Sequence, residues 1–368
     1  MERIRMRRMA RTTRMTQTPR TPSRRRRRAV PAALAAMLTL VLVAAGLGGL
    51  VVWQNSYELR EEAVTIRQGG RVLNGVLALP AQGKGPYPLV VFVHGDGPVD
   101  ATHDTFYRPM WEAFARSGHA SLSWNKPGVG GAPGDWLDQS MDDRADEAAD
   151  AITWARRHPD VDGARIGLWG ASQAGWVLPK IAARDPGIRF AIAVSPAVNW
   201  LRQGRYNLLA ELSRDGASDM EVAAALARRE TGLELLARGA SYEEYVRAVG
   251  DPEGMTAARW RFASKNHTAD VSADLPALRG TPVLLVLAGH DVNVDIAETE
   301  AAYRRLLPGP ALQVAHYPDA GHGLLDHAIE KSSLRLTLTA LCAPRALFAE
   351  GFLADQARFV SRALAAGS

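Results

Sequence analysis

Residues 165–176 read RIGLWGASQAGW, and this stretch decides the fold of the chain. It begins as an apolar strand, turns at Ser172 and continues as the start of a helix. Gly170, Ala174 and Gly175 flank Ser172 with almost no side chain, which a nucleophile elbow requires because strand and helix nearly touch where the chain reverses. The usual pattern is G-x-S-x-G, and Ala174 stands in for its last glycine. The alternative is a glycine-rich turn with an incidental serine, since short motifs produce false positives.

Outward from this stretch, apolar runs alternate with helical patterns. Residues 89–93 are apolar throughout, as expected of a strand buried on both faces of a parallel sheet. The pattern predicts a hairpin over 63–79, further strands at 120–124, 190–194, 282–287 and 312–316, and helices over 105–117, 142–157, 296–306 and 354–365. Pro179 is expected to kink the helix that follows the elbow. The predicted fold class is α/β, with a mostly parallel sheet and helices on both faces.

Residues 199–274 interrupt this alternation with helical patterns alone. Because ligands of open α/β sheets bind at the carboxyl edge of the strands, we expect the insertion to be a lid above that edge. Trp200, Tyr206 and Trp260 stand among arginines in it, which predicts a pocket of modest size with a cationic edge. Such a pocket suits small or acidic esters and short acyl chains rather than long lipids. The alternative is that these aromatic rings only pack the insertion onto the body.

The positive charge of the chain is confined to one end. The whole chain carries +5, whereas residues 1–28 contain twelve arginines and one glutamate, hence +11, and the remainder is therefore −6. A nucleic-acid-binding domain should instead carry basic clusters on its folded unit, so this class of partner is set aside. The single cysteine, Cys342, excludes an internal disulfide framework and a CxxC metal site.

An uncharged run, residues 29–53, follows directly after five arginines, Arg24–Arg28. About 20 apolar residues are enough to cross a bilayer as a helix. The positive-inside rule then predicts a cytoplasmic tail over 1–28, a single-pass anchor in the cell membrane over 29–53, and an extracytoplasmic domain over 54–368. The alternative is secretion after cleavage of a signal peptide next to Val43-Ala44-Ala45.

A serine nucleophile needs a base, and the base needs a carboxylate that orients it. His322 lies between two glycines after the last predicted strand, and Asp291 follows the strand before it. The order Ser172, Asp291, His322 is the one found in α/β hydrolases. Alternatives remain: Asp291 can cap the next helix, and nearby residues compete for both roles. The competitors are His290, His316, His327 and Asp319.

The oxyanion of an acyl-transfer intermediate needs two hydrogen-bond donors. The backbone N–H of Gln173, directly after the nucleophile, is the first candidate. The second is the N–H of Asp96 in the sequence HGDGP, residues 94–98. The Asp96 carboxylate is expected to point away from the developing negative charge, and His94 is expected to brace the loop rather than to react.

Together these motifs resemble the α/β-hydrolase superfamily, with closest similarity to serine esterases and dienelactone-hydrolase-like proteins. Those proteins carry an HGSGP-type loop, in which Asp96 here replaces the serine, and a GxSQGG-type elbow, in which Ala174 replaces a glycine. Residues 124–131, WNKPGVGG, resemble the family loop D-(K/R)-x-G-x-G-x-S, from which Asn125 and Ala132 depart. The resemblance covers residues 60–366 and implies hydrolysis of an ester-like bond in a small molecule, without a cofactor or metal.

Three other functions fit the same residues. A peptidase or amidase would use the same triad, and an acyltransferase would pass the acyl group to an alcohol instead of water. From a different class, a catalytically inactive binding module on a hydrolase scaffold is the remote alternative. The acyl group, the alcohol and the oligomeric state are left open by the sequence.

Overall fold

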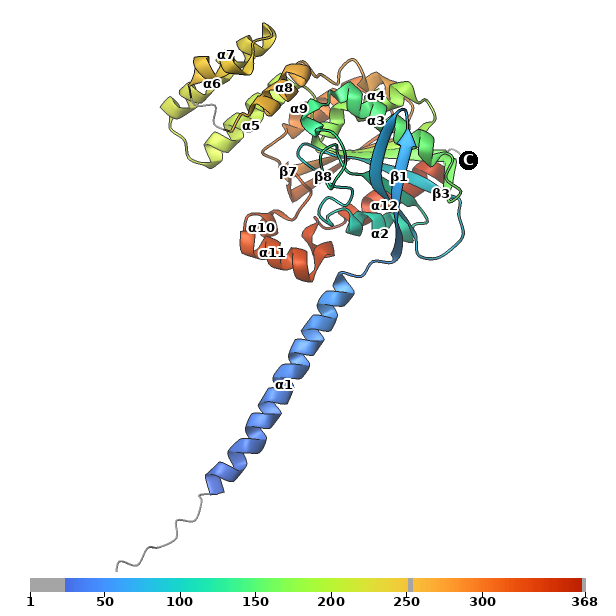
Figure 1. Ribbon diagram of the computed structural model, residues 1–368, viewed down its shortest axis with the longest axis vertical. Coiled ribbons are helices and arrows are strands. Elements are labelled where there is room, and N and C mark those ends of the chain that lie inside the picture. Colours follow the sequence, from blue (N-terminus) through green and yellow to red (C-terminus); the bar gives the residue numbers. More distant parts are fainter. Residues whose placement is uncertain (1–23, 251–253, 366–368) are drawn as a thin grey trace, which may run out of the picture. The chain divides into compact units, whose positions relative to one another are not determined.

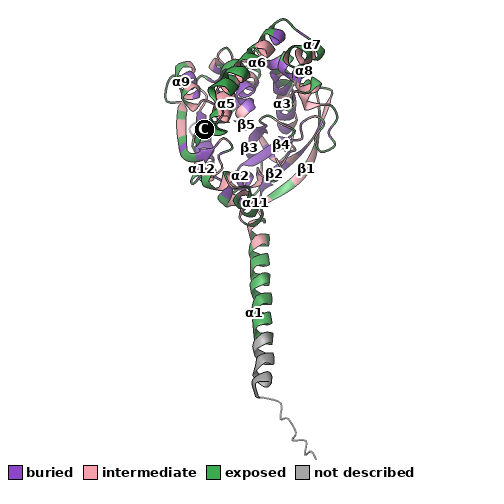
Figure 2. Ribbon diagram, turned by 90° about the vertical axis from the view of Figure 1, so that its left-hand side faces the viewer, coloured by how far each residue is buried: buried purple, intermediate pink, exposed green. Residues whose placement is uncertain are grey.

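The computed structural model describes residues 24–250 and 254–365, with side chains from residue 34 onward. The chain divides into two compact units between Trp53 and Gln54. The first contains α1 (Arg24–Gln54) except for its last residue. The α1 segment Leu34–Gln54 is apolar, with a mean hydropathy of 2.4, and is long enough to cross a membrane. Its described side chains are largely exposed (Figure 2). The expected apolar helix is therefore present.

The second unit is built on one eight-stranded sheet in the order β1-β2-β4-β3-β5-β6-β7-β8 (Figure 1). β1 pairs antiparallel with β2, and β2 with β4, whereas every other neighbouring pair is parallel. The mostly parallel sheet is thus confirmed. The strands are β1 (Leu59–Gln68), β2 (Arg71–Pro80), β3 (Tyr87–Val93), β4 (Ala120–Trp124), β5 (Val161–Ala171), β6 (Ile188–Val194), β7 (Val283–His290) and β8 (Leu312–Gly321).

Helices cover both faces of this sheet, and β3 shows why. Its residues alternate between two cores: Leu89, Val91 and Val93 face one, and Val90 and Phe92 face the other. The first core is closed by α3 (Met141–Ala155), α4 (Leu178–Arg184) and α9 (Ile296–Leu306). The second is closed by α2 (Arg108–Arg116) and α12 (Phe352–Ala365), with α10 (His327–Glu330) and α11 (Ser333–Cys342) near its rim.

Two helix expectations are corrected. Pro179 does not kink a helix: Ser172–Trp176 form a 3₁₀ turn, η2, and α4 then starts afresh with the proline in its first turn. Proline is favoured there because its missing N–H has no intrahelical acceptor. Likewise α2 begins at Arg108 rather than at residue 105, since His103, Asp104 and Thr105 all have positive φ.

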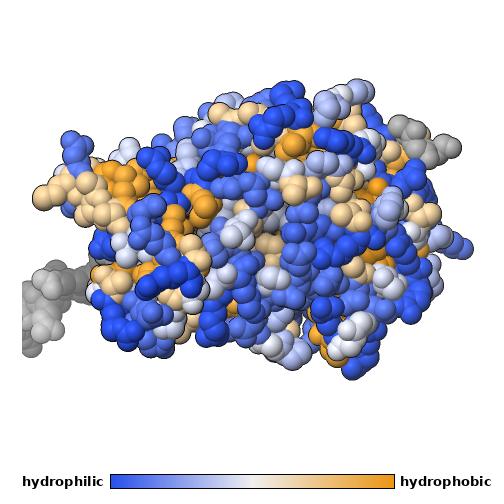
Figure 3. Space-filling view, turned by 90° about the horizontal axis from the view of Figure 1, so that it is seen from above, coloured by the Kyte–Doolittle hydropathy of each residue, from blue (hydrophilic) through white to orange (hydrophobic). Residues whose placement is uncertain are grey.

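The insertion after β6 is helical, as expected. It consists of α5 (Trp200–Arg214), α6 (Asp219–Ala237), α7 (Tyr242–Val249) and α8 (Ala257–Asn266), followed by the short turn η3 (Leu275–Leu278). A small core of its own, centred on Leu235, Leu236 and Trp260, holds α6, α7 and α8 together. From above, the face near these helices is mostly hydrophilic, with apolar patches between the polar side chains (Figure 3).

Candidate active site

Ser172 occupies a strained turn at the carboxyl end of β5. Its φ is +54°, in the left-handed region that residues other than glycine rarely adopt. A Cβ on Gly170 would lie 2.8 Å from the Ala174 Cβ, and one on Gly175 would lie 2.7 Å from the Ala197 oxygen. Both glycines are therefore required by close packing, whereas the alanine at 174 fits. The predicted elbow geometry is present despite the departure from G-x-S-x-G.

Asp291 and His322 lie at the ends of β7 and β8 and are hydrogen-bonded. The distance from His322 Nδ1 to Asp291 Oδ2 is 2.8 Å, and the Asp291 side chain is fully buried. Its other oxygen accepts the backbone N–H groups of Asn293 (2.8 Å) and Val294 (2.9 Å). Because the carboxylate can only accept, Nδ1 carries the proton and Nε2 is left as the basic nitrogen. Asp291 thus caps its own turn and orients the imidazole at the same time.

The competing residues lie elsewhere or are otherwise engaged. His290 stacks on His327, with 3.9 Å between ring centroids, and His316 pairs with Glu300 at 2.9 Å. Asp319 is exposed and makes no described contact with His322. Among the alternatives that the sequence left open, Asp291 and His322 are the pair that the structure brings together.

The second contact of the predicted triad, between Ser172 and His322, is not formed in this structure. No hydrogen bond among the described residues joins Ser172 Oγ to His322. Ser172 and Asn293 nevertheless line the same cavity, and Asn293 belongs to the Asp291 turn. Catalytic hydrogen bonds are often long without substrate and tighten in the complex. The Ser172–His322 contact therefore stays a prediction.

The direction of the Gln173 N–H is fixed by a hydrogen bond to the carbonyl oxygen of the same peptide unit, Ser172 O. Ser172 O accepts the backbone N–H of Ala197 at 3.0 Å. In a trans peptide the C=O and the following N–H point in opposite directions, so fixing Ser172 O also fixes the Gln173 N–H. Gln173 lies in the first turn of η2, where no intrahelical carbonyl accepts that N–H.

The amide of Asp96 is held in the same way, by Lys126. The Lys126 ammonium donates to Gly95 O (2.6 Å) and to Gly97 O (2.8 Å) from a buried position. Because Gly95 O and the Asp96 N–H belong to one peptide unit, the lysine sets the direction of the candidate oxyanion donor. Burial lowers the pKa of Lys126 well below its usual value. The sequence contained this residue in the WNKPGVGG loop, but its role was missed.

His94 is a brace, as expected. Its Nε2 donates to Trp124 O at 2.5 Å, so its Nδ1 accepts the Tyr107 hydroxyl at 3.0 Å. Burial lowers the pKa of His94 well below its usual value, so the ring is neutral. Arg144, buried in α3, donates to His94 O at 2.5 Å and completes the support of this loop.

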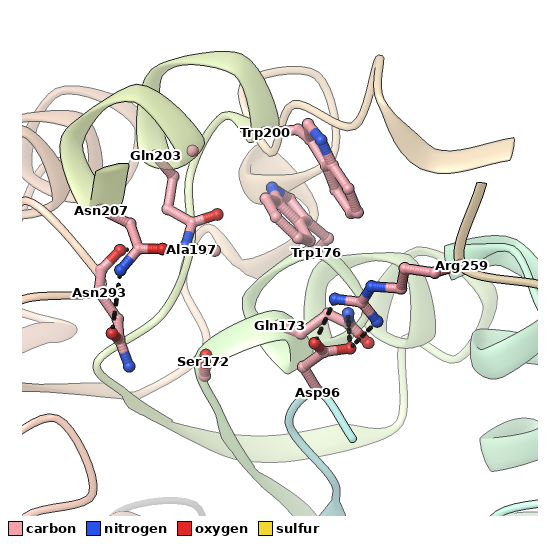
Figure 4. Close-up of a pocket in the computed structure, with 11 residues that line it drawn as sticks. Asp96, Ser172, Gln173, Trp176, Ala197, Trp200, Gln203, Asn207, Arg259 and Asn293 are labelled. Carbon is pink, nitrogen blue, oxygen red and sulfur yellow. Dashed lines mark hydrogen bonds and ion pairs between the residues drawn. The ribbon is translucent and has the colours of Figure 1, made fainter. Parts of the chain in front are cut away.

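The Asp96 carboxylate lines the cavity that also contains Ser172, and it is directed toward Arg259 and Gln173 (Figure 4). Arg259 of α8 neutralises it through two hydrogen bonds, of 3.0 and 2.5 Å. Gln173 Nε2 donates to the same carboxylate at 2.9 Å, and Arg144 donates to Gln173 Oε1 at 2.5 Å. Burial would raise the pKa of Asp96, but Arg259 outweighs burial and holds that pKa below its usual value.

Two neighbouring cavities lie at this edge of the sheet. The first, about 320 Å³, contains Ser172 and is walled by Trp176 and Trp200 (Figure 4). The second, about 580 Å³, lies among α5 to α8 and has apolar walls that include Leu233 and Met255. Both are lined by Trp200, Gly204, Asn207 and Arg259. The expectation of a single modest pocket therefore describes only the first cavity. An arginine, Arg259, does line it, but the charge of that arginine is paired with Asp96.

The first helix of the insertion is fastened to the Asp291 turn. Tyr206 donates its hydroxyl proton to Asp291 O at 2.9 Å, and Gln203 donates to Asn293 O at 3.0 Å. Tyr206 lines neither described cavity. Its expected place at the pocket rim is therefore wrong, because the ring supports the acid turn instead. Trp200 does lie at the rim.

One group of potential metal ligands occurs among the described residues, namely Glu62, His158 and Asp160. It lies near the start of β5, at the opposite end of that strand from Ser172. Half-exposed carboxylates gather in this way without a metal, and the group has no part in the site described above.

Comparison with known proteins agrees with this architecture. Residues 69–316 match the family described as X-Pro dipeptidyl-peptidase (S15 family). The thiohydrolase apmlB of Arthrinium phaeospermum is 29% identical over 279 residues, which cover 69% of this chain and 86% of that protein. The structure of DcsB in complex with its substrate analogue has a TM-score of 0.58 at 18% identity, covering 83% of this chain and 100% of that one. The α/β hydrolase GrgF from Penicillium sp. sh18 has a TM-score of 0.52 at 19% identity, with the same coverage. The fold is that of the α/β hydrolases.

Proposed function

This chain belongs to the X-Pro dipeptidyl-peptidase (S15) family, and from that membership and the site geometry we propose that it is a serine hydrolase cleaving carboxylic esters or thioesters. The observation that carries the proposal is the strained Ser172 at the end of β5, on one cavity with the turn that holds the Asp291–His322 pair. Strain of this kind persists where the surrounding structure over-determines it, as at active sites.

In the proposed mechanism, Ser172 Oγ attacks the acyl carbon while His322 Nε2 takes its proton. Asp291 keeps the proton of His322 on Nδ1 and stabilises the imidazolium that forms. The tetrahedral oxyanion accepts the N–H groups of Gln173 and Asp96, which are held through Ser172 O and Gly95 O. His322 then protonates the leaving alcohol or thiol, and a water molecule, activated by the same nitrogen, releases the acyl group.

The two cavities suggest how a substrate is accommodated. The cavity at Ser172 is bounded by Trp176 and Trp200 and has room for a small acyl group or alcohol. We propose that the larger cavity within the insertion takes the longer, apolar part of the substrate, and that α5 to α8 act as a lid. Arg259 lines both cavities, and its charge is paired with Asp96 there. The similarity to a thiohydrolase is the reason for including thioesters.

A second candidate function is an aminopeptidase-like activity, because the matching family is described as a dipeptidyl-peptidase. Such an enzyme has to bind the ammonium group of a free N-terminus, which calls for an uncompensated carboxylate near the nucleophile. Asp96 is the only carboxylate among the described residues that line the cavity at Ser172, and Arg259 already neutralises it. This pairing favours the ester or thioester over the peptide.

The test is a panel of substrates that share one acyl group. The full-length protein in detergent is given the ester, the thioester and the amide, together with an X-Pro anilide, and labelling by a fluorophosphonate is measured in parallel. We expect hydrolysis of the ester or thioester and stoichiometric labelling that disappears in Ser172→Ala. Preferential cleavage of the X-Pro anilide would favour the peptidase. Labelling that persists without Ser172 would refute the proposed nucleophile.

We also propose that α1 anchors the protein in the cell membrane with residues 54–368 outside the cytoplasm. The support is an apolar helix of sufficient length directly after Arg24–Arg28. Sequencing the mature N-terminus and digesting spheroplasts with protease tests it. A mature chain that begins near Gly46 would point to cleavage and secretion, and full protection of the domain would exclude export.

A further inference from the structure

The outer face of α11 carries unpartnered leucines. Leu334, Leu338 and Leu341 are 70%, 51% and 60% exposed. Spaced by four and three residues, they lie on one face of the helix. Leu336, on the other side, packs against the second core. The described part of the chain has five exposed large apolar side chains outside α1, and three of them are on this one face.

The segment that leaves the proposed anchor is bound next to this helix. Asn55 Nδ2 donates to Leu341 O at 2.8 Å. Arg345, directly beyond α11, donates to Gln54 O at 2.5 Å and to Ser56 O at 2.7 Å. Gln54 is the last residue of the apolar segment. The chain therefore leaves the proposed bilayer at a point that lies next to α11 in space, whatever the direction of α1.

Arg345 makes this attachment firm. Its guanidinium binds the buried Glu112 carboxylate through two nitrogens, at 2.6 and 2.9 Å, and lies 4.7 Å from the centre of the Tyr57 ring. A guanidinium with so many partners in fixed geometry holds the peptide at 54–56 against the domain. The leucine face is therefore kept near the membrane surface rather than merely tethered to it.

Charge also fits a bilayer as the covering partner. Between Glu330 and Glu350 the chain contains Lys331, Arg335 and Arg345 and no acidic residue, whereas the chain outside the basic tail carries −6. Since Arg345 is paired with Glu112, Lys331 and Arg335 supply the positive charge of this segment. A basic segment with an apolar face is the pattern of helices that lie in the interface of an anionic membrane, about 5–10 Å deep.

We propose that the Leu334–Leu338–Leu341 face of α11 inserts into the membrane interface beside the anchor and docks the domain on the bilayer. This rests on the proposed anchoring by α1. α11 and the helices α6 and α7 lie on opposite sides of the domain (Figure 1). Docking through α11 would thus leave the insertion and its cavities turned toward the aqueous phase.

The experiment measures the depth of a label at position 338. The full chain carrying Cys342→Ala and Leu338→Cys is labelled with an environment-sensitive fluorophore and reconstituted in vesicles of phosphatidylcholine and phosphatidylglycerol. Met220→Cys in the same background is the control, since Met220 is 79% exposed on α6. We expect doxyl lipids to quench the label at 338 at least several-fold more than the label at 220, and aqueous iodide to do the reverse.

Two readouts separate the possible failures. Resistance to extraction by alkaline carbonate reports the α1 anchor independently of the label. Protein that resists extraction while the label at 338 is quenched by iodide and not by doxyl lipids would overturn the docking proposal and leave the anchor intact. A label at 338 that is shielded from both quenchers, together with disulfide-linked dimers of the unlabelled Leu338→Cys protein under oxidation, would overturn it in favour of a second copy of the chain.

Discussion

The loops at the carboxyl edge of the sheet and the helices inserted after β6 hold their polar groups in different ways. In the loops, charged side chains are buried and bind backbone carbonyls: Lys126 is 2% exposed and Arg144 is 6% exposed. In the insertion, α5 and α7 bury no residue completely and α6 buries two, whereas α8 buries four. Contacts from the insertion to the edge loops come through a few side chains, notably Arg259 and Tyr206.

This difference suggests a division of work. An oxyanion hole must not reorganise during the reaction. In the proposed one, each N–H is fixed in direction because the carbonyl of the same peptide unit accepts a hydrogen bond. A lid must open, and the segments that move are those with few buried contacts. The comparison therefore predicts that substitutions in the edge loops lower turnover for every substrate, whereas substitutions in the insertion change which substrates are used.

The largest effect should come from the nucleophile. Ser172→Ala should lower kcat by about 10⁴-fold or more, with little change in thermal stability, because only the attacking oxygen is lost. Ser195→Ala is the matched control, since Ser195 also ends a strand with a positive φ of 41° but is fully buried. Comparable losses in both variants would show that the effect at position 172 is not specific to a nucleophilic hydroxyl.

The next effect should come from the lysine behind the oxyanion loop. Lys126→Met removes both hydrogen bonds that fix the carbonyls of Gly95 and Gly97. We expect kcat to fall by about 10²-fold for all substrates, near the cost of losing one oxyanion donor, while KM changes little.

Lys180→Met is the control for this substitution, because Lys180 forms ion pairs with Asp142 and Asp274 away from the site. It should leave kinetics unchanged. A rise in KM without loss of kcat in Lys126→Met would show that the lysine serves substrate binding instead.

The sequence predicted the local backbone features of the edge loops, but not the long-range contacts that hold them. The order Ser172, Asp291, His322 along the chain and the HGDGP loop could be predicted from the sequence, because each reflects a local backbone requirement. These requirements are a strained turn, a strand end and a glycine-bounded loop. The partners that fix these groups come from distant parts of the chain. Lys126 and Arg259 reach the loop from positions that no local pattern connects, so the sequence could name them as residues but not assign their contacts.

The errors have similar causes. Tyr206 was placed at the pocket from its aromatic character, but which side of α5 faces the cavity depends on how the insertion packs. The counter-ion of Asp96 was missed for the same kind of reason, because Arg259 lies 163 residues further along the chain. Pro179 was expected to kink one continuous helix after the elbow. The apolar pattern does not show that a 3₁₀ turn ends there and that a separate α-helix begins.

A smaller effect should follow from releasing the insertion from the edge loop. Arg259→Gln removes the ion pair with Asp96, and we expect kcat/KM to fall by less than about tenfold, since partly exposed pairs contribute little. Arg261→Gln on the same helix, which faces Asp138, is the control and should be neutral.

The pH dependence of this pair has a definite sign. Since Arg259 holds the pKa of Asp96 below its usual value, the contribution of the pair is complete above that usual value and is lost only as the pH falls through the lowered pKa. The ratio of kcat/KM between the protein and Arg259→Gln should thus stay constant from about pH 5 to about pH 8. A ratio that varied within this range would show that another group controls the contact.

The smallest change in rate, and the sharpest test of the division, concerns two aromatic residues of α5. Trp200 borders both cavities and stacks on Trp176 at 5.3 Å between centroids. Trp200→Ala should join the two cavities, so that the preference shifts toward bulkier acyl groups by several-fold while the best turnover changes little.

Tyr206→Phe keeps the ring but removes the hydrogen bond to Asp291 O, and should lower kcat a few-fold for all substrates alike. Measuring kcat/KM for a series of acyl chain lengths distinguishes them. If Trp200→Ala leaves the ranking unchanged, its ring only packs the insertion onto the body; if Tyr206→Phe alters the ranking, α5 is one unit and the proposed division between edge and insertion fails.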